Sequence, residues 1–142
     1  CACDIRIANA SSRFGVPINK LGHAFAYPEM APVVAAVGRR MVLELLLEGR
    51  IMDSDEAERC GLVNRVVADK DLDAEAEATA GRISEGAPLA NRATKKFLNR
   101  LLDPTPLTRE ELDEAYELCD SEDYAEGMRA FLAKEKPDFK GR

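Results

Sequence analysis

The sequence of 142 residues predicts an α/β fold in which a few short strands lie in the first half and helices make up the remainder. Apolar and polar residues alternate near the start, with the period of two that is typical of a half-buried strand. From Pro28 onward, apolar residues recur at helical spacing instead. So few strands would leave sheet edges open, and so many apolar helix faces exceed what a small sheet can cover. We therefore expect the helical half of a larger α/β fold, or an oligomer.

Three short strands are expected. Cys3, Ile5 and Ile7 alternate with charged residues and form the first of them. The second lies in the sequence SSRFGV, after a polar turn, and the third runs from Leu62 to Val67. Because the chain starts at Cys1, directly in strand-like sequence, we expect the beginning of the fold to lie upstream.

The first helix is expected to begin near Pro28, because a proline in the first turn of a helix loses no hydrogen bond. Gly38 interrupts the pattern, and Gly49 is placed as a glycine that ends a helix. The apolar face between the two glycines consists of Val42, Leu45 and Leu46.

The sequence DSDEAERCGLV predicts a short helix. Asp53 is a suitable N-cap, Glu56 follows three residues later, and Gly61 comes after the last turn.

Four further helices are expected, and each has an apolar face. The first two faces are Leu72, Ala76, Ala80 and Ile83, then Leu89, Ala93, Phe97 and Leu101. Thr108 and Glu111 form the pattern of a capping box before the third helix. The third face, expected to point inward, is Leu112, Ala115, Tyr116 and Cys119, and the last helix carries Tyr124, Met128, Phe131 and Leu132. Pro137 is expected to break the last helix.

Composition excludes several classes of protein. The net charge is −6 and the basic residues are scattered among acids, which argues against binding to nucleic acid. No apolar run approaches the length of a membrane span. The four cysteines form no C-x-x-C pair and His23 is the single histidine, so no metal site is expected. Free thiols are typical of a reducing compartment, and we expect a cytoplasmic protein.

Several separated segments resemble the enoyl-CoA hydratase/isomerase (crotonase) superfamily, and together they span the chain. They are CDIRIANASSRFGVPINKLG, VGRRMVLELLLEGRIMDSDEAERCGLVNRVV, GAPLANRATKKFLN and EGMRAFLAKEKPDFKGR. The resemblance is to the C-terminal portion of that family. It implies the crotonase-like (ClpP/crotonase) fold, which repeats a β-β-α turn and ends in helices that pack into trimers or hexamers.

The same resemblance implies a division of the chain and a class of substrate. Residues 1–86 would be the C-terminal part of the core, with walls of the acyl-CoA pocket, and residues 87–142 a helical oligomerisation region. The substrate would be a CoA thioester, and no separate cofactor is expected.

In this family two backbone N–H groups stabilise an enolate, and carboxylates move protons or water as general acid and base. By resemblance, both N–H donors and the first catalytic glutamate would lie upstream of Cys1. The second glutamate follows the proline of F-G-x-P-E, and Ile18 occupies that position. An aliphatic side chain transfers no proton, so we name no catalytic residue in this chain.

Four residues match positions that contact substrate in the family. Val16 and Ile18 would line the acyl pocket. The sequence FAYPE replaces the family's P-G-x-G-G loop and puts Ala26 at the glycine whose N–H helps to hold water. Lys134 matches a C-terminal lysine that reaches the phosphates of CoA, often from a neighbouring subunit.

Three other side chains are candidate replacements for the missing glutamate, and each has a plainer interpretation. His23 has a reference pKa suited to proton transfer, yet a lone histidine in a turn is more often structural or exposed. Glu29 could reach the pocket, or it could serve the dipole of a helix that begins at Pro28. Tyr27 could donate a hydrogen bond or simply pack.

Two functions fit the sequence. The first is a crotonase-like enzyme that acts on a CoA thioester as a hydratase, an isomerase or a relative, with Ile18 making it atypical. The second is a truncated, non-catalytic module that binds acyl-CoA or serves assembly. We also expect that the chain is part of a longer enzyme of normal length, which would restore the first interpretation.

Overall fold

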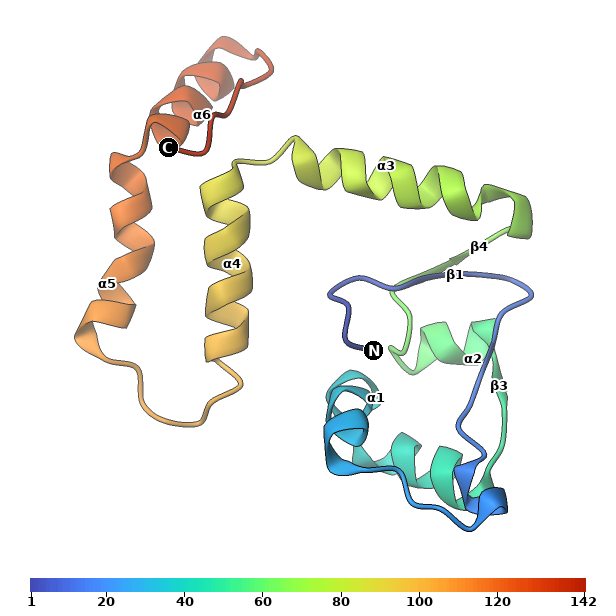
Figure 1. Cartoon of the computed structure of the whole chain (residues 1–142). Helices are drawn as coiled ribbons and strands as arrows, with labels where there is room; N and C mark the ends of the chain where they lie inside the picture. The colour runs from blue at the N-terminus through green and yellow to red at the C-terminus, as the bar shows by residue number, and fades with distance from the viewer. The chain divides into compact units, whose positions relative to one another are not determined.

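A computed structural model describes residues 1–142, which form two compact units, an N-terminal unit of residues 1–77 and a C-terminal unit of residues 78–142 (Figure 1). All strands belong to the N-terminal unit, and the C-terminal unit is helical. The predicted α/β class, with strands confined to the first half, is therefore confirmed.

The N-terminal unit holds two pairs of very short strands. Its elements are β1 (Ile7–Asn9), β2 (Arg13–Phe14), the 3-10 helix η1 (Ile18–Leu21), α1 (Tyr27–Glu48), β3 (Met52–Asp53), α2 (Ser54–Arg59), β4 (Arg65–Val67) and the 3-10 helix η2 (Asp69–Asp71). Strand β1 pairs in parallel with β4, and Ala8 lies opposite Val66. Strand β2 pairs with β3 in antiparallel fashion, and Phe14 lies opposite Met52.

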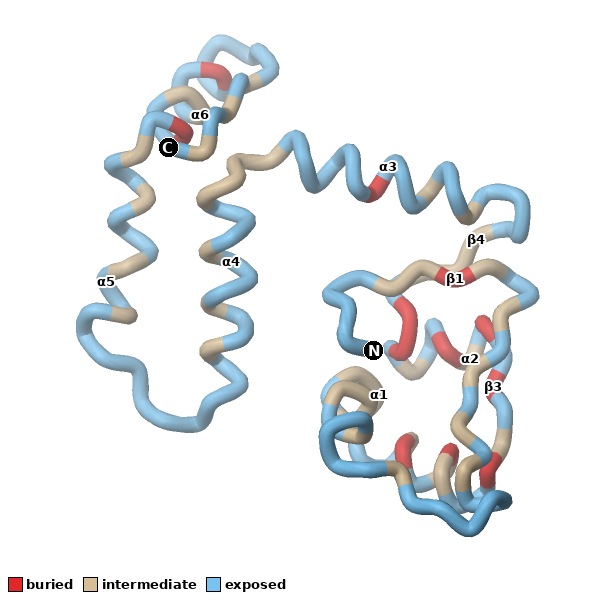
Figure 2. Tube along the Cα trace, viewed as in Figure 1, coloured by how far each residue is buried: buried red, intermediate tan, exposed pale blue.

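The first predicted strand is misplaced. Cys3 and Ile5 are exposed and precede β1, and the buried residue of that strand is Ala8 (Figure 2). Before β1 the backbone is held by a side chain rather than by a neighbouring strand. The N–H of Arg6 donates to Oδ1 of Asn64 at 2.8 Å, and the N–H of Asn64 donates to the carbonyl of Arg6 at 2.8 Å.

The other strands depart from prediction in their lengths. The predicted strand from residue 62 to 67 begins only at Arg65, because Leu62 and Val63 form a buried turn after α2. Strand β3 was not predicted, since two residues give no periodicity. It nevertheless carries Met52, whose exposed fraction is 1%.

Helix α1 follows its sequence signals. Pro28 lies in its first turn, Gly38 kinks it with φ 74° and ψ 162°, and Gly49 ends it with φ 58°. Both glycines have the positive φ that favours glycine over every other residue. The predicted face is confirmed by Val42 and Leu45, which are buried, and by the half-buried Leu46.

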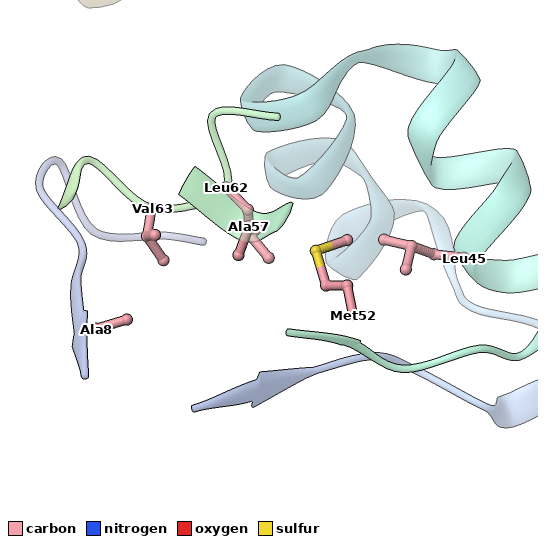
Figure 3. Packing of buried hydrophobic residues seen from close by; sticks show 6 residues of the cluster. All are labelled: Ala8, Leu45, Met52, Ala57, Leu62 and Val63. Carbon is pink, nitrogen blue, oxygen red and sulfur yellow. The ribbon is translucent and has the colours of Figure 1, made fainter. Parts of the chain in front are cut away.

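A small apolar core joins the elements of the N-terminal unit. Figure 3 shows its six buried members, which are Ala8, Leu45, Met52, Ala57, Leu62 and Val63. The side chain of Met52 points toward Leu45 from the end of α1. This core fixes α1 against β3 and α2, and thereby sets the position of the loop between β2 and α1.

The C-terminal unit consists of helices joined by short turns. Helix α3 (Leu72–Ser84) leads into it, and α4 (Pro88–Arg100), α5 (Arg109–Glu117), the 3-10 helix η3 (Leu118–Asp120) and α6 (Glu122–Ala133) follow. The capping box of Thr108 and Glu111 is present at the start of α5. Helix α6 ends three residues earlier than Pro137 requires, because Lys134 adopts the left-handed conformation with φ 57°.

The prediction that the apolar face of α5 points inward is wrong, and the apolar face of α6 is exposed as well. Tyr116 and Phe131 are 72% and 79% exposed, and no residue of α4 or α5 is buried (Figure 2). In α3 the buried position is Thr79 rather than the predicted alanines. An apolar face identifies the side chains that a helix can bury. Their burial also requires a second surface that packs against them. No helix of the protein is long and apolar enough to cross a membrane.

Candidate functional site

The segment from Gly15 to Ala26, between β2 and α1, carries three of the four predicted substrate-binding residues. Its backbone turns tightly after Pro17. The N–H of Ile18 donates to the carbonyl of Val16 at 2.8 Å, and Gly22 closes η1 in the left-handed conformation with φ 70°. Local glycine and proline positions therefore shape this segment.

Gly15 is required by a close approach of two backbones. A Cβ atom at this position would lie 2.6 Å from the carbonyl oxygen of Arg50, a separation that real side chains do not show. The loop that follows α1 therefore packs directly under the residues that lead to Ile18.

Val16 and Ile18 are both half-buried. They present aliphatic side chains, and neither can donate or accept a proton. Ala26 is the exposed N-cap of α1, and its carbonyl accepts the N–H of Met30 at 2.9 Å. We refer to the three predicted residues Val16, Ile18 and Ala26 together as the apolar wall, and helix α1 begins directly after Ala26.

The three candidate replacements for a glutamate are all exposed. Tyr27 is 89% exposed and lies at the first position of α1. Glu29 lies in the first turn of α1, where a carboxylate is favourable to the helix dipole. His23 touches the wall only through its backbone N–H, which donates to the carbonyl of Ile18 at 3.4 Å. None of the three side chains is ordered by a polar contact toward the wall.

Lys134 lies in the C-terminal unit, at the end of α6. Its side chain is exposed and makes no ion pair within the chain. Nearby lysines are engaged: Lys136 pairs with Glu85 at 2.7 Å, and Lys140 pairs with Asp138 at 2.5 Å. Lys134 is thus a free cation held by a well-defined backbone turn.

A buried carboxylate that the sequence did not reveal fixes the tail beyond Lys134. Asp123 is 3% exposed, and its two oxygens accept the N–H groups of Lys140 at 2.6 Å and of Gly141 at 2.9 Å. The N–H of Asp123 in turn donates to the carbonyl of Arg142 at 3.1 Å. The tail therefore folds back along α6. The sequence could not indicate this role of Asp123, because an acidic residue in the first turn of a helix is already explained by its favourable interaction with the helix dipole.

A second cluster that the sequence did not reveal lies beneath the apolar wall. Nη2 of Arg50 lies 2.6 Å from Oε1 of Glu44 and 2.5 Å from Oε1 of Glu56. Its Nη1 donates to Oε2 of Glu56 at 2.8 Å. The hydrogen bonds from Arg50 lower the pKa of Glu56 below its usual range. Glu56 was expected to support the cap of α2, and Asp53 provides that cap alone.

The N-terminal unit also has an open pocket of about 370 Å³ beside β1 and β2. Its lining residues are Cys1, Cys3, Ile5, Arg6, Ile7, Phe14, Leu62 and Val63. The wall residues Val16, Ile18 and Ala26 do not line this pocket. It contains no carboxylate or histidine that could act as a general base.

Comparison with known proteins places these features in a family. A family model described as "Enoyl-CoA hydratase/isomerase" matches residues 1–142. A probable enoyl-CoA hydratase of Mycobacterium bovis is 39% identical over 143 residues, which cover 99% of this chain and 55% of that protein. A short-chain-enoyl-CoA hydratase of Clostridium acetobutylicum is 36% identical over 146 residues, with coverage of 99% and 55%.

Solved structures agree with the sequence relatives. A crystal structure of an enoyl-CoA hydratase/carnithine racemase from Magnetospirillum magneticum is 56% identical, with a TM-score of 0.95 over 99% of this chain and 52% of that chain. A putative enoyl-CoA hydratase/isomerase family protein from Hyphomonas neptunium is 33% identical, with a TM-score of 0.90 over 99% and 54%. The chain thus spans about half the length of the relatives that it matches.

Proposed function

This chain belongs to the enoyl-CoA hydratase/isomerase family and has the crotonase-like fold of its C-terminal half, and we propose that its protein acts on a CoA thioester. The family match over residues 1–142 is the observation that carries this proposal. The reaction proceeds through an enolate that backbone N–H groups stabilise, because fixed donors that face a developing charge lower the barrier. By resemblance, those donors and the first glutamate belong to sequence upstream of Cys1.

In this proposal the chain contributes an apolar wall of the pocket. Val16 and Ile18 pack against the acyl group, and Ala26 stands at the position where the family has the glycine that helps to hold water. The half-buried aliphatic side chains of Val16 and Ile18 support the assignment, since acyl pockets are lined mainly by apolar groups.

Ile18 determines which reactions are open to the protein. Hydration in this family uses two carboxylates, one for the attacking water and one for the proton at the α carbon. With Ile18 in place of the second carboxylate, we assign a reaction in which a single carboxylate moves a proton, such as isomerisation of the double bond.

Lys134 is assigned to the phosphates of CoA. A lysine ammonium binds phosphate as a point charge, and Lys134 is exposed with no acidic partner in this chain. No cofactor other than the CoA thioester itself is assigned.

The protein is assigned to the cytoplasm and to a trimer or hexamer that forms through the helices after residue 86. The exposed apolar residues of α5 and α6 support that assembly, because large apolar faces seldom stay in contact with water. Three of them, Tyr116, Tyr124 and Phe131, are aromatic, a residue type that is enriched in interfaces.

The test uses the intact natural protein that contains this sequence, with crotonyl-CoA and a 3-enoyl-CoA as substrates. We expect binding of both thioesters and turnover of the 3-enoyl-CoA, followed by the absorbance of the conjugated product. A protein that neither binds acyl-CoA nor converts any enoyl-CoA contradicts the proposal.

Ile18 also favours a second function, a non-catalytic module that binds acyl-CoA or serves assembly. That function predicts a protein that oligomerises and binds acyl-CoA without any thioester chemistry. Turnover by the isolated chain of 142 residues contradicts it.

A further inference from the structure

The apolar wall is tied to the C-terminal end of α1 by one side chain. Nδ2 of Asn19 donates to the carbonyl of Leu47 at 2.9 Å. Leu47 belongs to the last turn of α1, where carbonyl groups have no partner within the helix. Asn19 therefore satisfies a helix terminus, and at the same time it fixes the residue next to Ile18 to a point 28 positions away in the sequence.

Glycine on each side of this bond allows the two backbones to approach. Any Cβ atom at Gly49 would clash with the carboxamide oxygen of Asn19, and Gly49 has a φ of 58° that already disfavours other residues. Gly15 approaches the carbonyl of Arg50 in the same way on the other side of Ile18. The wall is thus clamped at two points, one before Ile18 and one after it.

The surface on which the wall rests, residues 47–51, is itself held in place. Arg50 lies between the carboxylates of Glu44 on α1 and Glu56 on α2. These ion pairs connect the loop after α1 to two helices of the small core. Movement of the loop away from α1 and α2 would break these ion pairs.

We infer that Asn19 is a positioning residue that sets where Ile18 lies against the acyl group of the CoA thioester. This inference rests on the proposed function. Through its bond to Leu47, Asn19 fixes the aliphatic wall at one depth and thereby determines which acyl groups fit. This bond therefore affects contacts with the acyl group and does not affect contacts with the remainder of the CoA molecule.

The test compares two asparagine variants of the intact natural protein. Asn19→Ala removes the bond to Leu47, and Asn91→Ala is the matched control, because Nδ2 of Asn91 donates to the carbonyl of Ile83 at the same distance of 2.9 Å. Three quantities are measured: hydrogen exchange of the amides of residues 18–22, the affinity for crotonyl-CoA, and the affinity for free CoA.

Asn19→Ala is expected to speed exchange at the amides of Ile18 and Gly22 and to weaken binding of crotonyl-CoA by roughly three- to tenfold, the range of one hydrogen bond. Its affinity for free CoA is expected to stay within twofold of the wild type. Asn91→Ala is expected to leave all three quantities unchanged. If Asn19→Ala does not fold, Asn19→Leu keeps nearly the size of the side chain and removes the donor without adding a charge.

Either of two results overturns this inference and leaves the proposed function standing. The first is an Asn19 variant that binds crotonyl-CoA like the wild type, and the second is a variant whose affinities for crotonyl-CoA and for free CoA fall equally. An effect of Asn91→Ala as large as that of Asn19→Ala also overturns it, because it would show a general loss of structure. Failure of the wild type to bind any acyl-CoA or to convert any enoyl-CoA overturns the proposed function instead, while the exchange of the amides still decides whether Asn19 anchors the wall.

Discussion

Arg129 and Glu126 form a two-point ion pair on α6, with Nε donating to Oε2 at 2.7 Å and Nη2 donating to Oε1 at 2.8 Å. Oε1 of Glu126 also accepts the N–H of Asp138 at 3.1 Å. One carboxylate therefore links the guanidinium on its own helix to the backbone of the tail that follows Lys134. Because charge-assisted bonds of this kind stabilise the ionised carboxylate, the pKa of Glu126 falls to about 2.

The first prediction concerns the acid stability of the C-terminal tail. The pKa of Glu126 is 4.5 when unperturbed and about 2 in the folded chain, so Glu126 contributes stability above pH 4.5 and loses it as the pH falls toward 2. We expect the protection factor of the Asp138 amide, which is the exchange rate of the unfolded chain divided by that of the folded chain at the same pH, to fall over that interval. Glu126→Gln, which cannot be ionised, should remove the pH dependence of this protection factor between pH 4.5 and 2. A transition centred near pH 4.5 in the wild type would contradict the prediction.

The second prediction separates the assigned phosphate ligand from its neighbours. Lys134→Gln keeps most of the length of the side chain and removes the charge, and we expect roughly three- to tenfold weaker binding of crotonyl-CoA by the intact protein. The affinity should also depend less on salt concentration, since one exposed charge is lost. Isothermal titration at two ionic strengths measures both effects.

Lys136→Gln provides the control for this experiment, because Lys136 is already paired with Glu85 at 2.7 Å. It should leave the affinity and its salt dependence within twofold of the wild type. Equal losses in the two variants would mean that the C-terminal lysines act only through net charge, and Lys134 would lose its assignment.

The third prediction concerns the small core under the wall. Met52→Ala should lower the free energy of unfolding by about 2–5 kcal/mol, because Met52 is 1% exposed and its removal leaves a cavity among core residues. Leu47→Ala is the control, since Leu47 on α1 is 71% exposed, and it should change the value by less than about 0.5 kcal/mol. Urea denaturation measures both, and similar losses would contradict the described core.

Much of the fold could be predicted from the sequence where the rule is local. The start of α1 at Pro28, its kink at Gly38 and its end at Gly49 follow from what proline and glycine do to a backbone. The capping box of Thr108 and Glu111 could likewise be predicted, because it depends only on four neighbouring residues. Burial is not local. Tyr116 lies on the apolar face of its helix and is still 72% exposed.

The candidate site was less predictable. Val16, Ile18 and Ala26 are assigned to it only by resemblance, because aliphatic residues in a loop carry no chemical signal of their own. The bond between Asn19 and Leu47 joins residues 28 positions apart, and the ion pairs of Arg50 follow no helical spacing. Such contacts depend on the turn at Gly49, and therefore on the fold as a whole.

The fourth prediction tests the position of Ile18 directly. Ile18→Glu places a carboxylate where the family has its second glutamate, and the half-buried setting leaves room for the longer side chain to reach solvent. A positioned general acid or base contributes typically 10²–10⁴-fold to rate. We expect the intact variant to hydrate crotonyl-CoA at least about tenfold faster than the wild type, less than the full effect because nothing else in the pocket is adapted to it.

Ile18→Gln distinguishes proton transfer from polarity, because its side chain has nearly the same size as glutamate and cannot be ionised. It should leave the hydration rate at the wild-type level. The rate of Ile18→Glu should vary with pH across the titration of a carboxyl group, and that of Ile18→Gln should not. If both variants bind crotonyl-CoA and neither gains hydration, Ile18 does not face the reacting carbons. The wall would then act on the acyl chain farther from the thioester, and the missing glutamate would not be what limits hydration.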